Sequence, residues 1–388
     1  MPDEDIKLYD DENERRKALA YTRWREWLTL VGMIWSLATS ILALSTGFSA
    51  RLRSAVPSIP KLGPVIPYAA VMSLASFLAS LPLSWLSGFL VEHRFGLSNQ
   101  SLRGWLTDSL KGLGLSLVLG PLLAQGAYWV VGRFPRRWWA ILTALTVPLS
   151  IIFGTLAPVL IMPLFNKYEP LRDRHLADRL ERLAAEQGVA VSDVMQMDMS
   201  KQTRKANAMF TGMGRTKRIV LGDTLLDEFT PDEVEVVIAH ELGHQVHRDI
   251  WKLVALSAPI SALSLFTSSR LMPAVLHRFG KAWGLDVERG VADVAALPLL
   301  TLLAGLPMML ITPIVNALIR GQVEHPADVY AIDITNRPGA FISAMMKLGR
   351  MNLSNPHPSP IVKWLLYDHP TLAERIAYGR QRERGDQS

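Results

Sequence analysis

Residues Thr230 to His244 read TPDEVEVVIAHELGH and end in the pattern H-E-x-x-H. The first residues predict a helix start, with Thr230 as N-cap, Pro231 at the first helical position and Glu233 completing a capping box. The residues that follow supply a buried apolar face: Val234, Val236, Val237, Ile238 and Leu242. We therefore expect a buried helix, on which the small Gly243 allows another backbone to approach.

His240 and His244 lie four residues apart, so both imidazoles project from one helix face and can share one Zn²⁺. Glu241 is too close in sequence to be a third ligand on that face, but it suits the general base of a metalloprotease. The pentapeptide alone is moderately specific, and two solvated histidines on an ordinary helix are the alternative. The cap and a downstream acidic residue favour a zinc peptidase.

Composition indicates a membrane protein. The 388 residues are 49% hydrophobic and only 20% charged, and the apolar residues cluster in long runs. The absence of cysteine excludes disulfides and thiolate metal sites, so zinc must be held by histidine and carboxylate, as in catalytic sites. The net charge of +6 fits Lys and Arg at lipid headgroups. We expect a lipid bilayer as partner and no nucleic acid, because no basic, aromatic-interleaved patch occurs.

The apolar runs predict a mainly α fold, a polytopic transmembrane helical bundle of about six spans. With four spans before the His240 segment and six in all, the N-terminus, the His240 segment and the C-terminus lie on the same side of the membrane. We expect that side to be cytoplasmic, in the plasma membrane of a bacterium or an ER-type membrane of a eukaryote, because the polar N-terminus is basic and carries no signal peptide. The expected spans are 27–46, 65–90, 112–131, 138–161, 253–272 and 294–318.

The polar segment between the fourth and fifth spans predicts a small zincin-like α/β catalytic unit. It contains an amphipathic helix over 171–187 and a strand with a turn over 189–199. Two further strands, 206–210 and 217–221, are joined through Gly212, Met213 and Gly214. The expected organisation is a lead-in (1–26), four spans (27–165), the soluble catalytic part (166–249), two spans (250–320) and a C-terminal helical part that completes the site (321–388).

A catalytic zinc site needs a third protein ligand. The metzincin arrangement requires histidine where this chain has Ile250. His247 could bind, but three ligands on one short helix are geometrically awkward. Glu324 is the better candidate, because it follows the last span and Asp328, four residues on, could hydrogen-bond a ligating imidazole. Pro326 interrupts this spacing, and a solvated acidic patch is the alternative interpretation.

Seven ordered blocks between about Leu81 and Ile376 resemble the type I CAAX prenyl protease family, integral-membrane zinc endopeptidases related to heat-shock membrane proteases. The blocks are Ala157-Pro158 with Pro163–Lys167, Ala206–Phe210, Arg218–Leu221, Asp223–Leu226, the His240 motif, Glu324 with Ala327-Asp328, and His369–Leu372 with Glu374-Arg375. Eukaryotic members have an additional N-terminal span and an insertion before the zinc helix, and His325-Pro326 replaces an aromatic–polar pair. Both departures leave the substrate open.

The resemblance implies that Glu324 is the third zinc ligand and that Asp328 supports the ligands. It implies that Asn207 lies on a strand edge where a substrate peptide adds as an extra strand, and that His369 stabilises the oxyanion. Without the resemblance, Asn207 would be a turn residue and His369 a loop residue. Arg320 is expected to pair with Glu324, Asp328 or the substrate, or else to snorkel at the interface.

The sequence therefore predicts an integral-membrane zinc endopeptidase with one Zn²⁺ per chain, held by His240, His244 and Glu324, and with Glu241 and His369 as catalytic residues. Its substrate is a peptide or protein, and the first expectation is C-terminal processing of prenylated or membrane-associated proteins. The second is quality control of membrane proteins without prenylation. An alternative of another class is a non-catalytic membrane scaffold or lipid-binding chamber.

Overall fold

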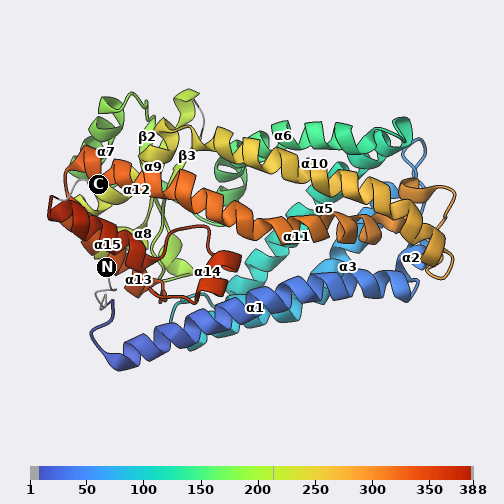
Figure 1. Cartoon of the computed structure of the whole chain (residues 1–388), viewed down its shortest axis with the longest axis horizontal. Coiled ribbons are helices and arrows are strands. Elements are labelled where there is room, and N and C mark those ends of the chain that lie inside the picture. The colour runs from blue at the N-terminus through green and yellow to red at the C-terminus, as the bar shows by residue number, and fades with distance from the viewer. Residues whose placement is uncertain (1–7, 213, 386–388) are drawn as a thin grey trace.

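The computed structural model describes residues 8–212 and 214–385 and is mainly helical (Figure 1). Six helical segments in this part of the chain are long and apolar enough to cross a membrane, which confirms the predicted polytopic bundle. Figure 1 shows the long helices running along the longest axis, with the sheet, the start of α1 and the last helix at one end. The segments are built on α1 (Glu12–Ser45), α3 (Val65–Trp85) with α4 (Val91–Arg94), α5 (Leu102–Arg133), α6 (Trp138–Leu156), α10 (Asp249–Val275) and α11 (Leu297–Ile319).

Several helices extend beyond the expected spans. Helix α1 begins at Glu12 rather than Trp27, because Asp11 caps its first turn and Glu12 pairs with Arg15 and Arg16. Most of the polar lead-in is thus helical, and Met1 to Lys7 lie outside the described residues. The last span continues from α11 through a π-helical turn (Arg320–Glu324) into α12 (His325–Thr335). Pro326, the second residue of α12, has no N–H to donate to the helix, and Lys252 Nζ donates to the carbonyl of Gln322, four residues earlier, at 3.3 Å.

The soluble part contains a four-stranded sheet in the order β1-β2-β4-β3. Strands β2 and β4 are parallel, and the two outer pairs are antiparallel, with Val220 opposite both Met195 and Met209. The three expected strands are present, whereas β1 was not predicted because three residues show no alternation. Met213, in the predicted connecting turn, lies outside the described residues. Strand bounds are β1 (Tyr168–Pro170), β2 (Asp193–Met197), β3 (Ala208–Thr211) and β4 (Arg218–Gly222).

Helices cover this sheet and share one hydrophobic core with it. Leu180, Ile219, Ile238, Phe341 and Ile376 are almost fully buried in this core, each contributing about 1.5–3 kcal/mol by burial. Residues from both halves of the chain are therefore needed to build one compact catalytic unit. The helices are α7 (Arg174–Glu186), α8 (Asp223–Glu228), α9 (Pro231–Val246), α13 (Pro338–Met351) and α15 (Leu372–Glu383); the remaining ones are α2 (Phe48–Ala55) and α14 (Pro360–Leu366).

Candidate active site

Helix α9 is fixed firmly before it reaches the histidines. Thr230 and Glu233 form the predicted reciprocal capping box. The buried carboxylate of Glu233 also accepts a hydrogen bond from Lys347 Nζ at 2.7 Å. Further along, Gly243 allows close approach of α12, because a Cβ at this position would lie only 3.2 Å from Ala327 Cα. The close approach of α12, which follows Glu324 directly, brings the motif helix against the segment that carries this residue.

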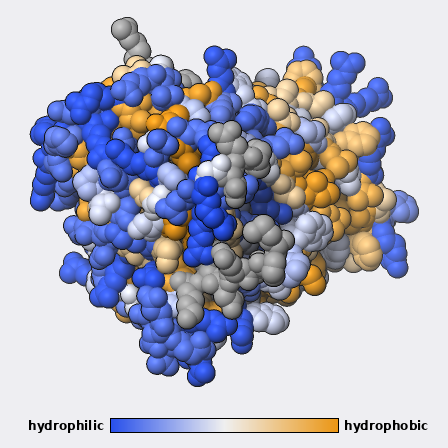
Figure 2. Space-filling view, turned by 60° about the vertical axis from the view of Figure 1, so that its left-hand side comes forward, coloured by the Kyte–Doolittle hydropathy of each residue, from blue (hydrophilic) through white to orange (hydrophobic). Residues whose placement is uncertain are grey.

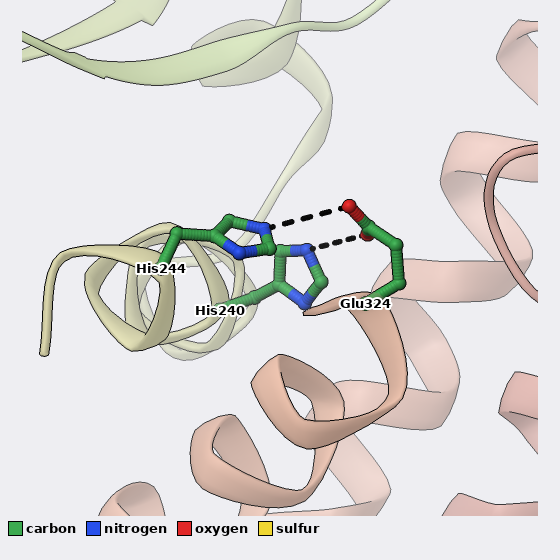
Figure 3. A group of neighbouring side chains, drawn as sticks. All are labelled: His240, His244 and Glu324. Atoms are coloured by element: carbon green, nitrogen blue, oxygen red, sulfur yellow. Dashed lines mark ion pairs between the residues drawn. The ribbon is translucent and has the colours of Figure 1, made fainter. Parts of the chain in front are cut away.

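His240, His244 and Glu324 converge on one point, although Glu324 is 80 residues away in sequence (Figure 3). His240 Nε2 lies 3.5 Å from Glu324 Oε2, and His244 Nε2 lies 3.8 Å from Glu324 Oε1. One donor atom from each residue lies within 4.8 Å of the others. Figure 3 shows both imidazoles directed from α9 towards the carboxylate.

This donor set fits Zn²⁺. Two histidines and one glutamate are the ligands of a catalytic zinc site. Glu324 is buried, and its Oε2 makes no aligned hydrogen bond within the described residues although His369 Nε2 and His240 Nε2 lie 3.1 Å and 3.5 Å away, so this oxygen suits a cation. Burial lowers the pKa of His240, but the neighbouring carboxylates of Asp328 and Glu324 outweigh this and raise it to about 9. The surroundings of His240 thus favour a positive charge, as a bound metal supplies.

Both histidines have carboxylate partners on their other ring nitrogen. His240 Nδ1 lies 2.9 Å from Asp328, which also accepts a 2.9 Å hydrogen bond from Arg375 Nε. His244 Nδ1 lies 2.8 Å from Asp249. Such partners fix the tautomer, so that Nε2 is free to ligate. The contact of Asp328 with a ligating imidazole was predicted from its spacing to Glu324, whereas those of Asp249 and Arg375 were not predicted.

The two predicted catalytic residues, Glu241 and His369, differ in their surroundings. Glu241 is half-buried, and its carboxylate makes no hydrogen bond or ion pair in the described chain. His369 Nε2 lies 3.1 Å from Glu324 Oε2, and its Nδ1 lies 2.8 Å from Asp368. Burial lowers the pKa of His369, but the Asp368 hydrogen bond and the charge of Glu324 raise it above its usual value. His369 is therefore favoured as a proton-carrying donor.

Asn207 is exposed and directly precedes β3, the strand at the edge of the sheet. Its carbonyl accepts a 2.9 Å hydrogen bond from Gly222 N, which extends the pairing of β3 with β4 by one residue. The other side of β3 has no strand partner among the described residues. The placement agrees with the expected peptide-pairing edge.

The predicted pairing of Arg320 requires correction, and His247 is excluded as a ligand, as the sequence favoured. Arg320 does not pair with Glu324 or Asp328; it donates instead to the carbonyl of Lys363 at 3.1 Å and to that of Tyr367. The Tyr367 carbonyl lies at the C-cap of α14, where helical partners are lacking, whereas the Lys363 carbonyl also accepts the Tyr367 N–H at 3.2 Å. His247 lies outside the cluster, with its ring packed against Tyr330 at a centroid distance of 5.3 Å.

The fold and the site together define a membrane metallopeptidase. Residues 170–383 match the family profile described as Peptidase family M48, and residues 1–167 match CAAX prenyl protease N-terminal, five membrane helices. The chain belongs to peptidase family M48. It is a multi-pass membrane zinc protease of the CAAX-protease type, as the resemblance predicted. Only four of its six candidate spans lie within 1–167, one fewer than that profile's description gives.

Similar proteins span nearly the whole chain. An uncharacterized metalloprotease, YhfN, of Bacillus subtilis is 30% identical over 96% of this chain and 86% of its own length. CAAX prenyl protease 1 of Saccharomyces cerevisiae is also 30% identical, over 94% of this chain and 85% of its own length. The crystal structure of S. mikatae Ste24p superposes with a TM-score of 0.83 at 27% identity, covering 96% of this chain and 90% of that one.

Proposed function

We propose that the protein cleaves peptide bonds near the C-terminus of membrane-associated proteins, with prenylated proteins as the first substrate class. The observation that carries this proposal is the convergence of His240, His244 and Glu324 beside an open strand edge, at the end of a helical membrane bundle. The similarity to proteins named CAAX prenyl protease 1 supports the prenylated class.

His240, His244 and Glu324 would hold the metal. Bound Zn²⁺ supplies positive charge that polarises the scissile carbonyl and lowers the pKa of the attacking water. Glu241 accepts the proton of that water and delivers it to the leaving amine. His369 donates a hydrogen bond from Nε2 to the oxygen of the scissile carbonyl as negative charge develops there.

Other residues position these groups. Asp328 and Asp249 orient the two imidazoles, and Arg320 holds the C-terminal carbonyls of α14, just before His369. Arg320 is thus a positioning residue rather than one that contacts substrate. Asn207 and β3 offer main-chain hydrogen bonds to an extended peptide, which adds affinity without restricting side chains.

The catalytic unit faces the cytoplasm in this proposal. Arg15, Arg16, Arg23 and Arg25 are exposed on the end of α1 that lies beside the catalytic unit in Figure 1. Basic residues next to a first span favour retention on the cytoplasmic side. The membrane is the plasma membrane in a bacterial host and an ER-type membrane in a eukaryotic one.

The test compares cleavage of matched farnesylated and unprenylated C-terminal peptides by the purified zinc-loaded protein, with Glu241→Gln as control. A preference for the farnesylated peptide would support processing of prenylated proteins. Equal cleavage would favour quality control without prenylation. Cleavage of neither, with one zinc bound, would contradict the peptidase proposal and favour a scaffold.

A further inference from the structure

The stretch of chain that leads into the free edge of β3, residues 202–206, is attached to the membrane bundle as well as to its own sheet. Arg204 N donates to the Leu97 carbonyl at 3.0 Å, and Asn99 N donates to the Gln202 carbonyl at 3.1 Å. Leu97 and Asn99 belong to the connection between the second and third spans. The position of Asn207, three residues after Arg204, is therefore set in part by the membrane bundle.

A network of charged and polar groups fixes Lys205 within this stretch. Lys205 Nζ lies 2.9 Å from Oε2 of Glu92, near the end of the second span, and it donates to the hydroxyl of Tyr21 in α1 at 2.7 Å. The Tyr21 hydroxyl donates in turn to Glu92 Oε1 at 2.8 Å. Tyr21 and Glu92 are both buried, so the ion pair is screened only weakly by water. Two membrane helices are thus joined to the stretch before β3.

Lys205 is the close cationic partner of Glu92. The other cation near this carboxylate, Arg25, is half exposed and lies farther away, with Nη1 at 3.7 Å from Glu92 Oε1. Removing one partner of a buried ion pair is costly, because the other charge stays buried and uncompensated. On its main chain, Lys205 also accepts a 2.8 Å hydrogen bond from Thr224 Oγ1 of α8. Lys205 therefore ties a backbone held by the catalytic unit to a carboxylate held by the bundle.

We propose that Lys205 is a positioning residue for the peptide-pairing edge, whose ion pair with Glu92 holds Asn207 and the start of β3 in place for an added strand. The inference rests on the proposed peptidase function. Because an added strand binds through main-chain hydrogen bonds, a displaced edge weakens the binding of any extended peptide. The network contains no ligand of the metal cluster, so zinc binding and the chemical step are retained when it is broken.

The test measures kcat and KM for one extended peptide, cleaved by the full-length zinc-loaded protein. Lys205→Met should raise KM by about tenfold and leave kcat within about twofold of the wild-type value. Lys205→Arg keeps the charge and should recover most of the loss in KM. Lys201→Met is the matched control, because it removes an exposed cation that pairs with Asp198 in the same connection between β2 and β3, and it should leave both constants unchanged.

A double-mutant cycle shows whether the effect passes through Glu92. The KM of Lys205→Met combined with Glu92→Gln should lie below the product of the two single effects, because both substitutions break one interaction. Independent effects would overturn the proposal.

An unchanged KM in Lys205→Met, or a loss confined to kcat, would overturn the positioning role while leaving the peptidase function intact. Absence of cleavage by wild-type protein with bound zinc would contradict the peptidase function itself. Zinc content and thermal unfolding report whether the variants fold. If Lys205→Met does not fold, Tyr21→Phe, which removes one hydroxyl from the network, should raise KM by about threefold, and an unchanged KM would contradict the proposal.

Discussion

Nδ1 of His244 lies 2.8 Å from a carboxylate oxygen of Asp249, the first residue of α10. Arg248, between the two helices, adopts a left-handed conformation with φ of 55°, and the chain turns there so that Asp249 meets the histidine. Lys252 Nζ lies 2.6 Å from the other oxygen of Asp249. A membrane-spanning helix therefore orients a candidate metal ligand.

Asp249→Ala should lower zinc affinity by about 10–100-fold, because the imidazole loses the partner that fixes its tautomer. Competition with a fluorescent zinc chelator measures this affinity, and peptidase activity should return at excess zinc. Asp227→Ala, on an exposed position of α8, is the control. Equal affinities for the two variants would contradict a supporting role for Asp249.

Substituting Glu324 and His247 in turn should show which of them is the third zinc ligand. Glu324→Ala removes the carboxylate of the cluster, so we expect zinc content to fall from one ion per chain to almost none. His247→Ala should retain zinc, since its ring packs against Tyr330 away from the cluster. Zinc content is measured by metal analysis after dialysis against a weak chelator. Zinc retained in Glu324→Ala and lost in His247→Ala would show that His247 is the third ligand.

Arg375→Gln should destabilise the catalytic unit by about 3–5 kcal/mol, because the buried Asp328 carboxylate loses its charged partner. Thermal unfolding in detergent would show a lowered midpoint. The double variant Arg375→Gln with Asp328→Asn removes both charges and should recover part of the loss. A midpoint equal to that of wild type in Arg375→Gln would show that the pair is not needed for stability.

The capping box at the start of α9 should make the free energy of unfolding depend on pH in the acid range. Burial raises the pKa of Glu233, but hydrogen bonds from Lys347, Ser343 and Thr230 outweigh burial and hold it below its ordinary value of 4.5. The folded state therefore favours the ionised carboxylate of Glu233. The stabilisation that this carboxylate provides is complete above pH 4.5 and is lost as the pH falls through its lower pKa in the folded protein.

Glu233→Gln should therefore flatten the dependence of the unfolding midpoint on pH below about 4.5 and lower the midpoint at neutral pH. Glu181→Gln, at an exposed position of α7, should keep the wild-type profile. If the unfolding midpoints of Glu233→Gln and wild type changed with pH in parallel, the Glu233 carboxylate would not be the source of the pH dependence.

Features that depend on neighbouring residues were predictable from the sequence. The capping box, the zinc helix and the six spans follow from local patterns of composition and periodicity, and all are present. Figure 2 shows the surface counterpart of the predicted spans: hydrophobic residues gather towards the membrane bundle, and hydrophilic residues lie over the catalytic unit.

Contacts made by chain reversal or long-range packing were not predictable. Asp249 reaches His244 only because α9 ends and the backbone turns at Arg248, whereas five residues along one helix would separate them. Arg375 meets Asp328 through the packing of α15, and Arg320 meets the Lys363 and Tyr367 carbonyls because α14 packs beside the end of the last span. The four spans predicted before the soluble part have counterparts among the described residues, whereas the family profile describes five membrane helices.

The most direct test of the central claim is the rate at which Glu241→Gln cleaves a peptide that the wild-type protein cuts. The substitution keeps the size of the side chain and removes its basicity, so we expect kcat to fall by at least about 10²-fold. Zinc content and the unfolding midpoint should stay at wild-type values, and Glu228→Gln on the exposed side of α8 should cleave normally. Full activity of zinc-loaded Glu241→Gln would contradict the assignment of Glu241 as the general base.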